Sequence, residues 1–304
     1  MSQRTESLLQ RSIDTLKVDT RLALMLALCA LVMIIDGFDI AALPLALPYI
    51  TRLWGVPPAE FSFALSAVVL GLGVGALVVA PFGDRYGRRP LVIGSVAAIA
   101  LATLATATSK DVTGFVGWRL LTGVALGAAL PNVTALIAEV VPRGMRATMI
   151  TLVGCGVPVG GTVAGRVVPT LHDLGGWEMI FYFAAAGTGV LVVVLYWVLP
   201  ESPKHLLTHR PQDPALARLA ARAGVEVEAW AADARAQASV QAPRVRLPVL
   251  QPLARPYWLA TSVYYGLYTA NAAILYMLAS WVPTLLSQVD FSIAQASRMA
   301  AAVQ

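Results

Sequence analysis

Long apolar segments alternate with short polar links along most of the 304-residue chain. A helix needs about 20 apolar residues to cross a lipid bilayer, and these segments are of that length or longer. The pattern predicts membrane-spanning helices at 22–50, 60–82, 91–108, 114–141, 148–171, 178–199 and 257–283, with another span beginning near Ala294. The expected fold class is therefore an all-α polytopic membrane protein with a six-helix N-terminal bundle and the first one to two helices of a second bundle.

Basic residues are distributed unevenly between the links. Alternate links, beginning with the N-terminal segment, hold 17 Lys and Arg residues, whereas the intervening links hold 2. Because basic loops stay in the cytoplasm, the N-terminus and the long central loop are expected there, in a bacterial inner (plasma) membrane. The expected division is a cytoplasmic segment at 1–21, a transmembrane bundle at 22–199, a cytoplasmic loop at 200–256 and an incomplete second bundle at 257–304.

The overall composition agrees with a membrane protein. Hydrophobic residues make up 58% of the chain, charged residues make up 13%, and the mean hydropathy is +0.70. Soluble domains average about 25% charged residues. The net charge of +5 follows from the basic loops and is not a reason to expect a nucleic-acid partner. The central loop has a helix-forming middle, which predicts a short surface helix.

The link between the second and third spans, "APFGDRYGRRP", concentrates charge at the membrane face. Its charged and flexible positions are Asp84, Arg85, Gly87, Arg88 and Arg89. Glycine permits a tight reversal of the chain, and the arginines can bond the carboxylate and nearby helix ends. We interpret the loop as a conformational latch that holds one state. The alternative is an ordinary basic loop of the cytoplasmic face.

The fourth span contains two charges. Arg119 is followed at i+4 and i+8 by Gly123 and Gly127, a spacing that clears one helix face for a neighbouring helix. An arginine that snorkels outward is the alternative interpretation. Glu139 ends the span on the cytoplasmic side, where we expect it to join the latch charges. A solvated helix end would place it there equally well.

Two carboxylates interrupt the first span, in the sequence "IIDGFDIAALP". An acidic residue at the middle of a bilayer costs about 2.5–3.5 kcal/mol on insertion scales, so Asp36 and Asp39 favour a functional explanation. At i and i+3 they share one helix face, and their mutual repulsion favours a proton on one of them near neutral pH. We predict a proton-coupling and substrate site at this pair, with Arg119 attracting the substrate carboxylate or modulating the proton. The alternative is a pair locked to arginines of neighbouring helices.

The seventh span carries a stripe that fits an aromatic ligand. Tyr264, Tyr268 and Asn271 fall at i, i+4 and i+7, and aromatic rings with polar tips suit an aromatic carboxylate. We predict a substrate pocket from these residues and Phe38, although helix packing or an interfacial belt explains such a stripe as well. The sequence has no metal-binding or phosphate-binding motif. We expect no catalytic residues, no enzymatic activity, no metal and no cofactor other than a proton gradient.

The charged link resembles the signature of the major facilitator superfamily, Gly-x-x-x-Asp-Arg-x-Gly-Arg-Arg/Lys, with Ala80 in place of the first glycine. "DGFD", "RLLTGVALGAALPN", "PESP" and "SWVPTLL" together resemble the aromatic acid:proton symporter family of 4-hydroxybenzoate and benzoate transporters. The resemblance implies proton-coupled uptake of an aromatic or related organic acid by alternating access. The implied partners are that acid, protons and the lipid bilayer, and the implied state is a monomer.

Two other functions remain open at this point. The glycine-rich fifth span is compatible with a proton-coupled antiporter or exporter of the same superfamily. The resemblance also implies a plan of six plus six spans, whereas this sequence supplies about seven and a half. A truncated chain is therefore expected, either a fragment or an inactive or sensor form.

Overall fold

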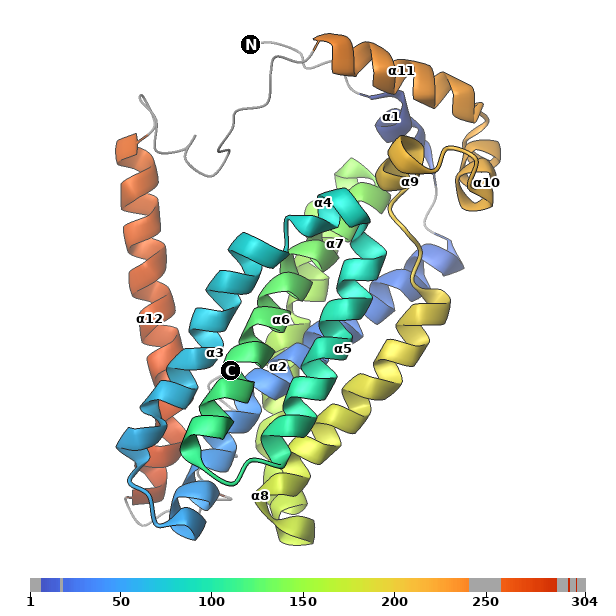
Figure 1. Ribbon diagram of the computed structural model, residues 1–304. Helices are drawn as coiled ribbons and strands as arrows, with labels where there is room; N and C mark the ends of the chain where they lie inside the picture. The colour runs from blue at the N-terminus through green and yellow to red at the C-terminus, as the bar shows by residue number, and fades with distance from the viewer. Residues whose placement is uncertain (1–6, 17–18, 241–257, 289–294, 296–298, 300–304) are drawn as a thin grey trace.

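The computed structural model describes residues 7–16, 19–240, 258–288, 295 and 299, and the regular elements among them are all helical (Figure 1). In chain order they are α1 (Leu8–Thr15), α2 (Thr20–Trp54), η1 (Pro58–Phe61), α3 (Ser62–Val74), η2 (Gly75–Val79), α4 (Phe82–Tyr86), α5 (Arg88–Ala107), α6 (Val112–Val140), α7 (Arg143–Gly154), α8 (Gly156–Val198), α9 (Pro203–His209), α10 (Pro214–Ala223), α11 (Val227–Val240) and α12 (Trp258–Gln288). The long helices lie side by side, and α4 marks the end of the bundle where the short helices gather. This end is called the α4 end below.

Five helical segments of the described chain are long and apolar enough to cross a membrane. They are Thr20–Trp54, Ala59–Val79, Arg88–Ala107, Val112–Val140 and Arg143–Val198. The last segment contains two of the predicted spans, because Gly176 takes a φ of 77° and breaks α8. Helix α12 is 31 residues long and is not among these five segments. The all-α, polytopic fold class predicted from the sequence is confirmed.

Glycines set how closely the long helices approach. A Cβ on Gly160 of α8 would lie 1.9 Å from a backbone oxygen of α2, and a Cβ on Gly37 of α2 would lie 2.0 Å from one of α8. Gly123 and Gly127 of α6 face backbone oxygens of α3 in the same way, at 2.3 and 2.1 Å. Real Cβ atoms do not come so near to oxygen, so larger residues would force these helices apart. The prediction that the α6 glycines clear a face for a neighbour is confirmed.

The end of the bundle opposite the α4 end is filled by packed aromatic rings. They are Trp54, Phe61, Phe115, Trp177 and Phe181. The ring centres of neighbouring pairs lie 5.7–6.3 Å apart, mostly in tilted or edge-to-face arrangements that are favourable for aromatic quadrupoles. The cluster ties the end of α2 to α6 and α8. It therefore fixes the depth at which the polar residues of α2 lie in the bundle.

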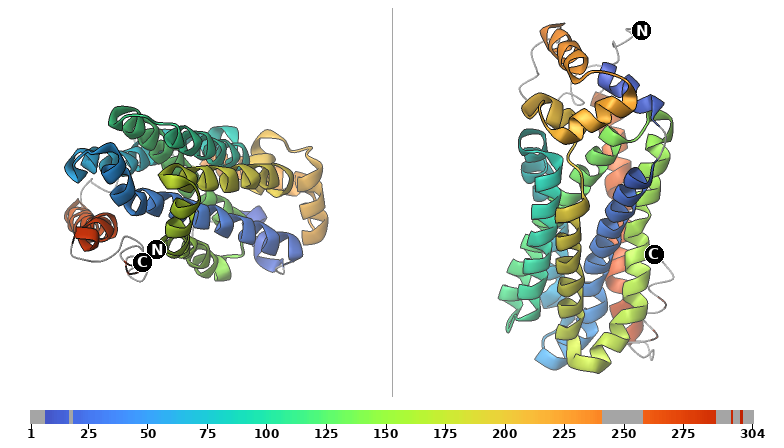
Figure 2. Two further views of the ribbon diagram at one scale, coloured as in Figure 1. Left: turned by 90° about the horizontal axis from the view of Figure 1, so that it is seen from below. Right: turned by 90° about the vertical axis from the view of Figure 1, so that its right-hand side faces the viewer.

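Helices α1, α9, α10 and α11 form a small unit at the α4 end, which we call the helical cap (Figure 2). Its core contains Leu9 of α1, Leu206 of α9, Leu216 of α10 and Trp230 of α11. The Trp230 indole Nε1 donates to the Ser12 hydroxyl at 3.0 Å. The sequence predicted one short helix in this part of the central loop. Three form there because each buries its apolar side against the others and against α1.

Candidate functional site

A buried ion pair lies inside the bundle between α2 and α6. The Arg119 guanidinium Nη2 donates to the two Asp39 carboxylate oxygens at 3.1 and 3.2 Å, and the two side chains are 0% and 1% exposed. Thr103 of α5 donates its hydroxyl to the same carboxylate at 2.8 Å. The Arg119 guanidinium carbon also lies 5.2 Å from the ring centre of Phe181. The arginine therefore faces the bundle interior, where buried ionic and π contacts replace water.

Asp36 has a different environment, although it lies three residues from Asp39 on the same helix. It is 1% exposed, and neither of its carboxylate oxygens has a hydrogen-bond partner among the described residues. A buried carboxylate anion without a partner costs far more than the neutral acid. The arrangement thus separates the two acids into one that is held as an ion pair and one that is suited to carry a proton permanently.

The residues predicted to form a substrate pocket do not converge in this structure. Phe38 is buried in α2 and its ring centre lies 5.9 Å from that of Phe183 in α8. Tyr264 and Tyr268 of α12 stack on each other at 6.3 Å and are 65% and 63% exposed, and Asn271 is exposed as well. Helix α12 packs along α2, but within the described residues no ring contact joins its tyrosines to Phe38.

A second polar network lies at the α4 end and contains three of the predicted latch residues. Arg88 of α5 pairs with Asp84 of α4 and lies 3.7 Å from Glu139 of α6. The Arg88 Nη1 also donates to Asn132 Oδ1 at 3.0 Å. Glu139 accepts a hydrogen bond from the hydroxyl of Ser202, which stands just before α9. The network joins α4, α5, α6 and the cap, as a latch between segments requires.

The other latch candidates lie beside this network rather than in its ion pairs. Gly87 adopts a φ of 106° at the start of α5, a conformation that favours glycine. The first two N–H groups of α5 donate to Glu201, at 3.0 and 3.1 Å. Arg89 donates to the Tyr196 carbonyl oxygen. Arg85 lies over the ring of Tyr86 at 5.5 Å and has no ion pair within the described residues.

Several partners were not singled out from the sequence. At the central pair they are Thr103, Thr122 and Phe181, and at the α4 end they are Asn132 and Ser202. Asn132 could have been found from the sequence, because it is a polar residue inside a predicted span. Polar side chains inside a membrane are costly and often mark functional positions. The threonines gave no comparable signal, because threonine often bonds its own helix backbone in apolar segments. Within the described residues, no group of three or more His, Cys, Asp or Glu side chains is arranged to hold a metal.

A bundle of long apolar helices with a buried ion pair inside it and a polar network at one end is the architecture of a polytopic membrane protein. The sequence profile of the Major Facilitator Superfamily matches residues 29–303, and the chain belongs to that superfamily. It is 32% identical over 274 residues to the gallate transporter of Pseudomonas putida, covering 90% of this chain and 60% of the relative. It is 33% identical over 279 residues to the 4-hydroxybenzoate transporter PcaK of Pseudomonas aeruginosa, covering 91% and 62%.

The fold comparison agrees with the family. The proton:xylose symporter XylE matches with a TM-score of 0.61 at 16% sequence identity, over 71% of this chain and 52% of that one. At this identity the likeness concerns the fold alone. The chain spans about 60% of the length of the curated relatives it matches. The resemblance to aromatic acid transporters that was read from the sequence motifs is thus confirmed at the level of homology.

Proposed function

We propose that the protein works in a secondary transporter that carries an aromatic or related organic acid across the bacterial inner membrane, coupled to protons, by alternating access. Relatives named as gallate and 4-hydroxybenzoate transporters support the substrate class. The excess of basic residues at the α4 end supports a cytoplasmic location for that end. The protein is proposed to act as a monomer in the bilayer, with the proton gradient as its only cofactor.

The observation that carries the mechanism is the Asp39–Arg119 pair. A substrate carboxylate offers Arg119 the same chemistry as Asp39 does, so the two compete for one guanidinium. Protonation of Asp39 removes its negative charge and frees Arg119 to bind the substrate. Asp36, which has no charged partner, stays neutral through the cycle and can donate a hydrogen bond. In this mechanism Asp39 carries the coupling proton.

The network at the α4 end supplies the second element of alternating access. Opening that end requires α4 and α5 to part from α6 and the cap, and this motion breaks the contacts of Arg88 with Glu139 and Asn132. While they are intact, these contacts favour the conformation that is closed at the α4 end. Gly156 and Gly160 of the fifth predicted span, whose glycines suggested an exporter, pack against α2, and this packing gives that alternative no separate support.

Uptake of labelled 4-hydroxybenzoate and gallate into proteoliposomes under an imposed pH gradient tests the proposal. We expect Asp36→Asn to keep most of the gradient-driven accumulation, since asparagine resembles a neutral aspartic acid. Asp39→Asn should still bind the acid but lose acceleration by the pH gradient. Asp173→Asn, at an 83%-exposed side chain, is the matched control. If the Asp36→Asn and Asp39→Asn variants both take up the acid as wild type does, the proton-site role fails. If the wild-type protein binds the acid but does not accumulate it, a sensor is favoured.

A further inference from the structure

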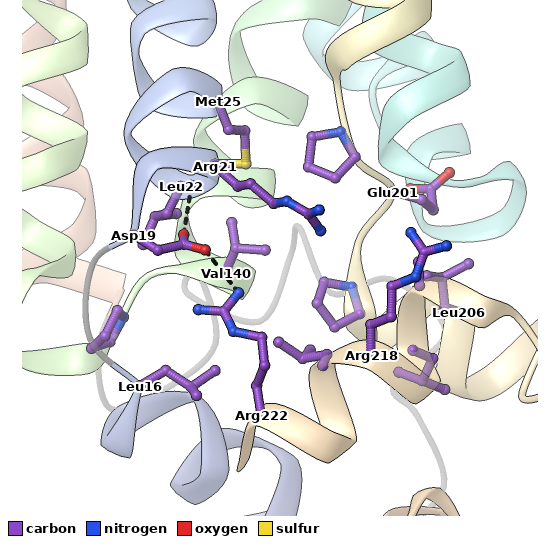
Figure 3. A pocket seen from close by; sticks show the side chains of 16 residues that line it. Leu16, Asp19, Arg21, Leu22, Met25, Val140, Glu201, Leu206, Arg218 and Arg222 are labelled. Carbon is purple, nitrogen blue, oxygen red and sulfur yellow. Dashed lines mark hydrogen bonds and ion pairs between the residues drawn. The ribbon is translucent and has the colours of Figure 1, made fainter.

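A cleft separates the start of α2 and the end of α6 from the helical cap (Figure 3). Its volume is about 210 Å³, and its walls are mostly apolar, with Leu22 and Met25 of α2 opposite Leu216 and Leu219 of α10. Pockets for drug-sized ligands measure about 300–1,000 Å³. The cleft therefore has room for a single ring and a small polar group, but it excludes a nucleotide.

Three arginines project toward this cleft from opposite sides, Arg21 from the first turn of α2 and Arg218 and Arg222 from α10. Arg222 forms an ion pair with Asp19 at 2.9 Å. Arg21 and Arg218 have no ion pair within the described residues, and the Glu201 carboxylate that also lines the cleft accepts the N–H groups at the start of α5. Two guanidinium groups are thus available to a ligand beside an apolar wall.

We propose that this cleft binds a small organic carboxylate with one ring. The ring fits between the leucine and methionine side chains, and the carboxylate accepts hydrogen bonds from the planar guanidiniums of Arg21 and Arg218, which are shaped for such a head group. An anionic phospholipid offers a similar charge in its head group, so it is a separate arm of the test below. The apolar wall also discriminates against inorganic phosphate and against small acids without a ring.

The location of the cleft makes the site separate from the transport pathway. Arg21 lies at the first turn of α2, whereas Asp39 lies five turns further along the same helix, because three to four residues make one turn. The cleft joins α2 and α6 to the cap, so an occupant would hold the cap on the bundle, as the hydrogen bond from Ser202 to Glu139 also does. The acid would thus stabilise the docked cap from a site outside its own pathway.

Hydrogen–deuterium exchange on the purified 304-residue protein tests the site, with benzoate as the probe and benzamide as its neutral counterpart. We expect benzoate to slow exchange saturably in peptides from α10 and the start of α2, and benzamide to have little effect. The Arg21→Gln/Arg218→Gln double variant should need a roughly tenfold or higher benzoate concentration for the same protection. Arg235→Gln, on the exposed side of α11, changes the cap charge without touching the cleft and should behave as wild type.

A second variant covers the possibility that loss of two arginines disturbs the cap. Ala215→Trp fills the cleft from its rim while it keeps both guanidiniums, and it should abolish protection by benzoate. Exchange in the unliganded variants shows whether the cap is intact. Equal protection in the double variant, equal protection by benzamide, or protection only by phosphatidylglycerol nanodiscs would overturn the proposal. If benzoate slows exchange at the cleft but the protein shows no gradient-driven transport, the cleft site stands and the proposed function fails.

Discussion

Removal of either member of the Asp39–Arg119 pair is expected to destabilise the protein, but with different pH dependences. Asp39→Asn leaves a guanidinium in the bundle interior, where Arg119 is 0% exposed, and a guanidinium does not lose its proton. Breaking a buried ion pair from one side costs about 3–5 kcal/mol. The remaining contacts of Arg119 with Thr122 and Phe181 place the expected loss near the lower end of that range.

The loss of folding free energy caused by Arg119→Gln has an upper limit, because Asp39 can take up a proton once its arginine partner is gone. An ordinary aspartate at pH 7 lies about three units above its pKa, and each unit is worth about 1.4 kcal/mol, so protonation costs about 4 kcal/mol. The folded variant then binds one proton more than the unfolded chain does above pH 4. Its stability therefore rises as the pH falls, and it regains about 3 kcal/mol between pH 7 and pH 5.

Unfolding of the purified variants followed by tryptophan fluorescence measures both effects, with wild type at each pH as the reference. Asp39→Asn should show no gain relative to wild type on acidification. The double variant Asp39→Asn/Arg119→Gln lacks an unpaired charge and should be more stable than Asp39→Asn alone. Asp39→Asn within 1 kcal/mol of wild type, or Arg119→Gln without recovery at pH 5, would refute the ion pair as described.

Three further changes test the packing and the α4 end. Gly160→Ala should destabilise the bundle strongly and Gly73→Ala should not, as judged by unfolding, because the new methyl meets a backbone oxygen at 1.9 Å in the first and nothing within 4 Å in the second. Asn132→Ala removes a hydrogen-bond partner of Arg88 and should therefore increase opening of the α4 end, measured by crosslinking of cysteines introduced there. Unchanged opening would contradict the latch. Burial lowers the pKa of His205, so NMR should find it neutral at pH 7, and its contribution to stability should be lost as the pH falls below about 6.5.

The sequence was most informative where a single helix carries the signal. Apolar length predicted the long helices, and the i, i+4 spacing after Arg119 predicted the glycine face that α3 meets. It could not distinguish Asp36 from Asp39, because they share a helix face and their difference depends on how α5 and α6 cross α2. The alternative of an acidic pair locked to arginine describes Asp39 and does not describe Asp36.

The helical cap was the least predictable part of the fold. Its helices are short, so each has little tendency to form alone, and their stability comes from contacts between segments far apart in the chain. The Trp230 indole donates a hydrogen bond to Ser12, which is 218 residues away in the sequence, and no local sequence pattern predicts such a pairing. The cleft with Arg21 and Arg218 depends on the same assembly. The predicted pocket of Phe38 with α12 stays a prediction.

Charge balance in the bundle leads to a prediction about stoichiometry. In the empty site Asp39 and Arg119 neutralise each other and Asp36 is neutral, so the net charge is zero. A monocarboxylate bound to Arg119 would leave an extra negative charge in a low-dielectric interior, unless Asp39 takes up a proton. Each turnover should therefore move one acid anion with one proton, and no net charge.

Proteoliposomes with a potassium diffusion potential and no pH gradient measure this directly. Electroneutral transport should give no accumulation of 4-hydroxybenzoate under the potential alone, whereas a pH gradient of equal energy should drive it. A dicarboxylate substrate would serve as the internal comparison, because its second charge has no proton site in the pair and should make uptake respond to the potential. Accumulation of a monocarboxylate driven by the potential alone would show that more than one proton moves, and Asp36 would then have to carry the additional one.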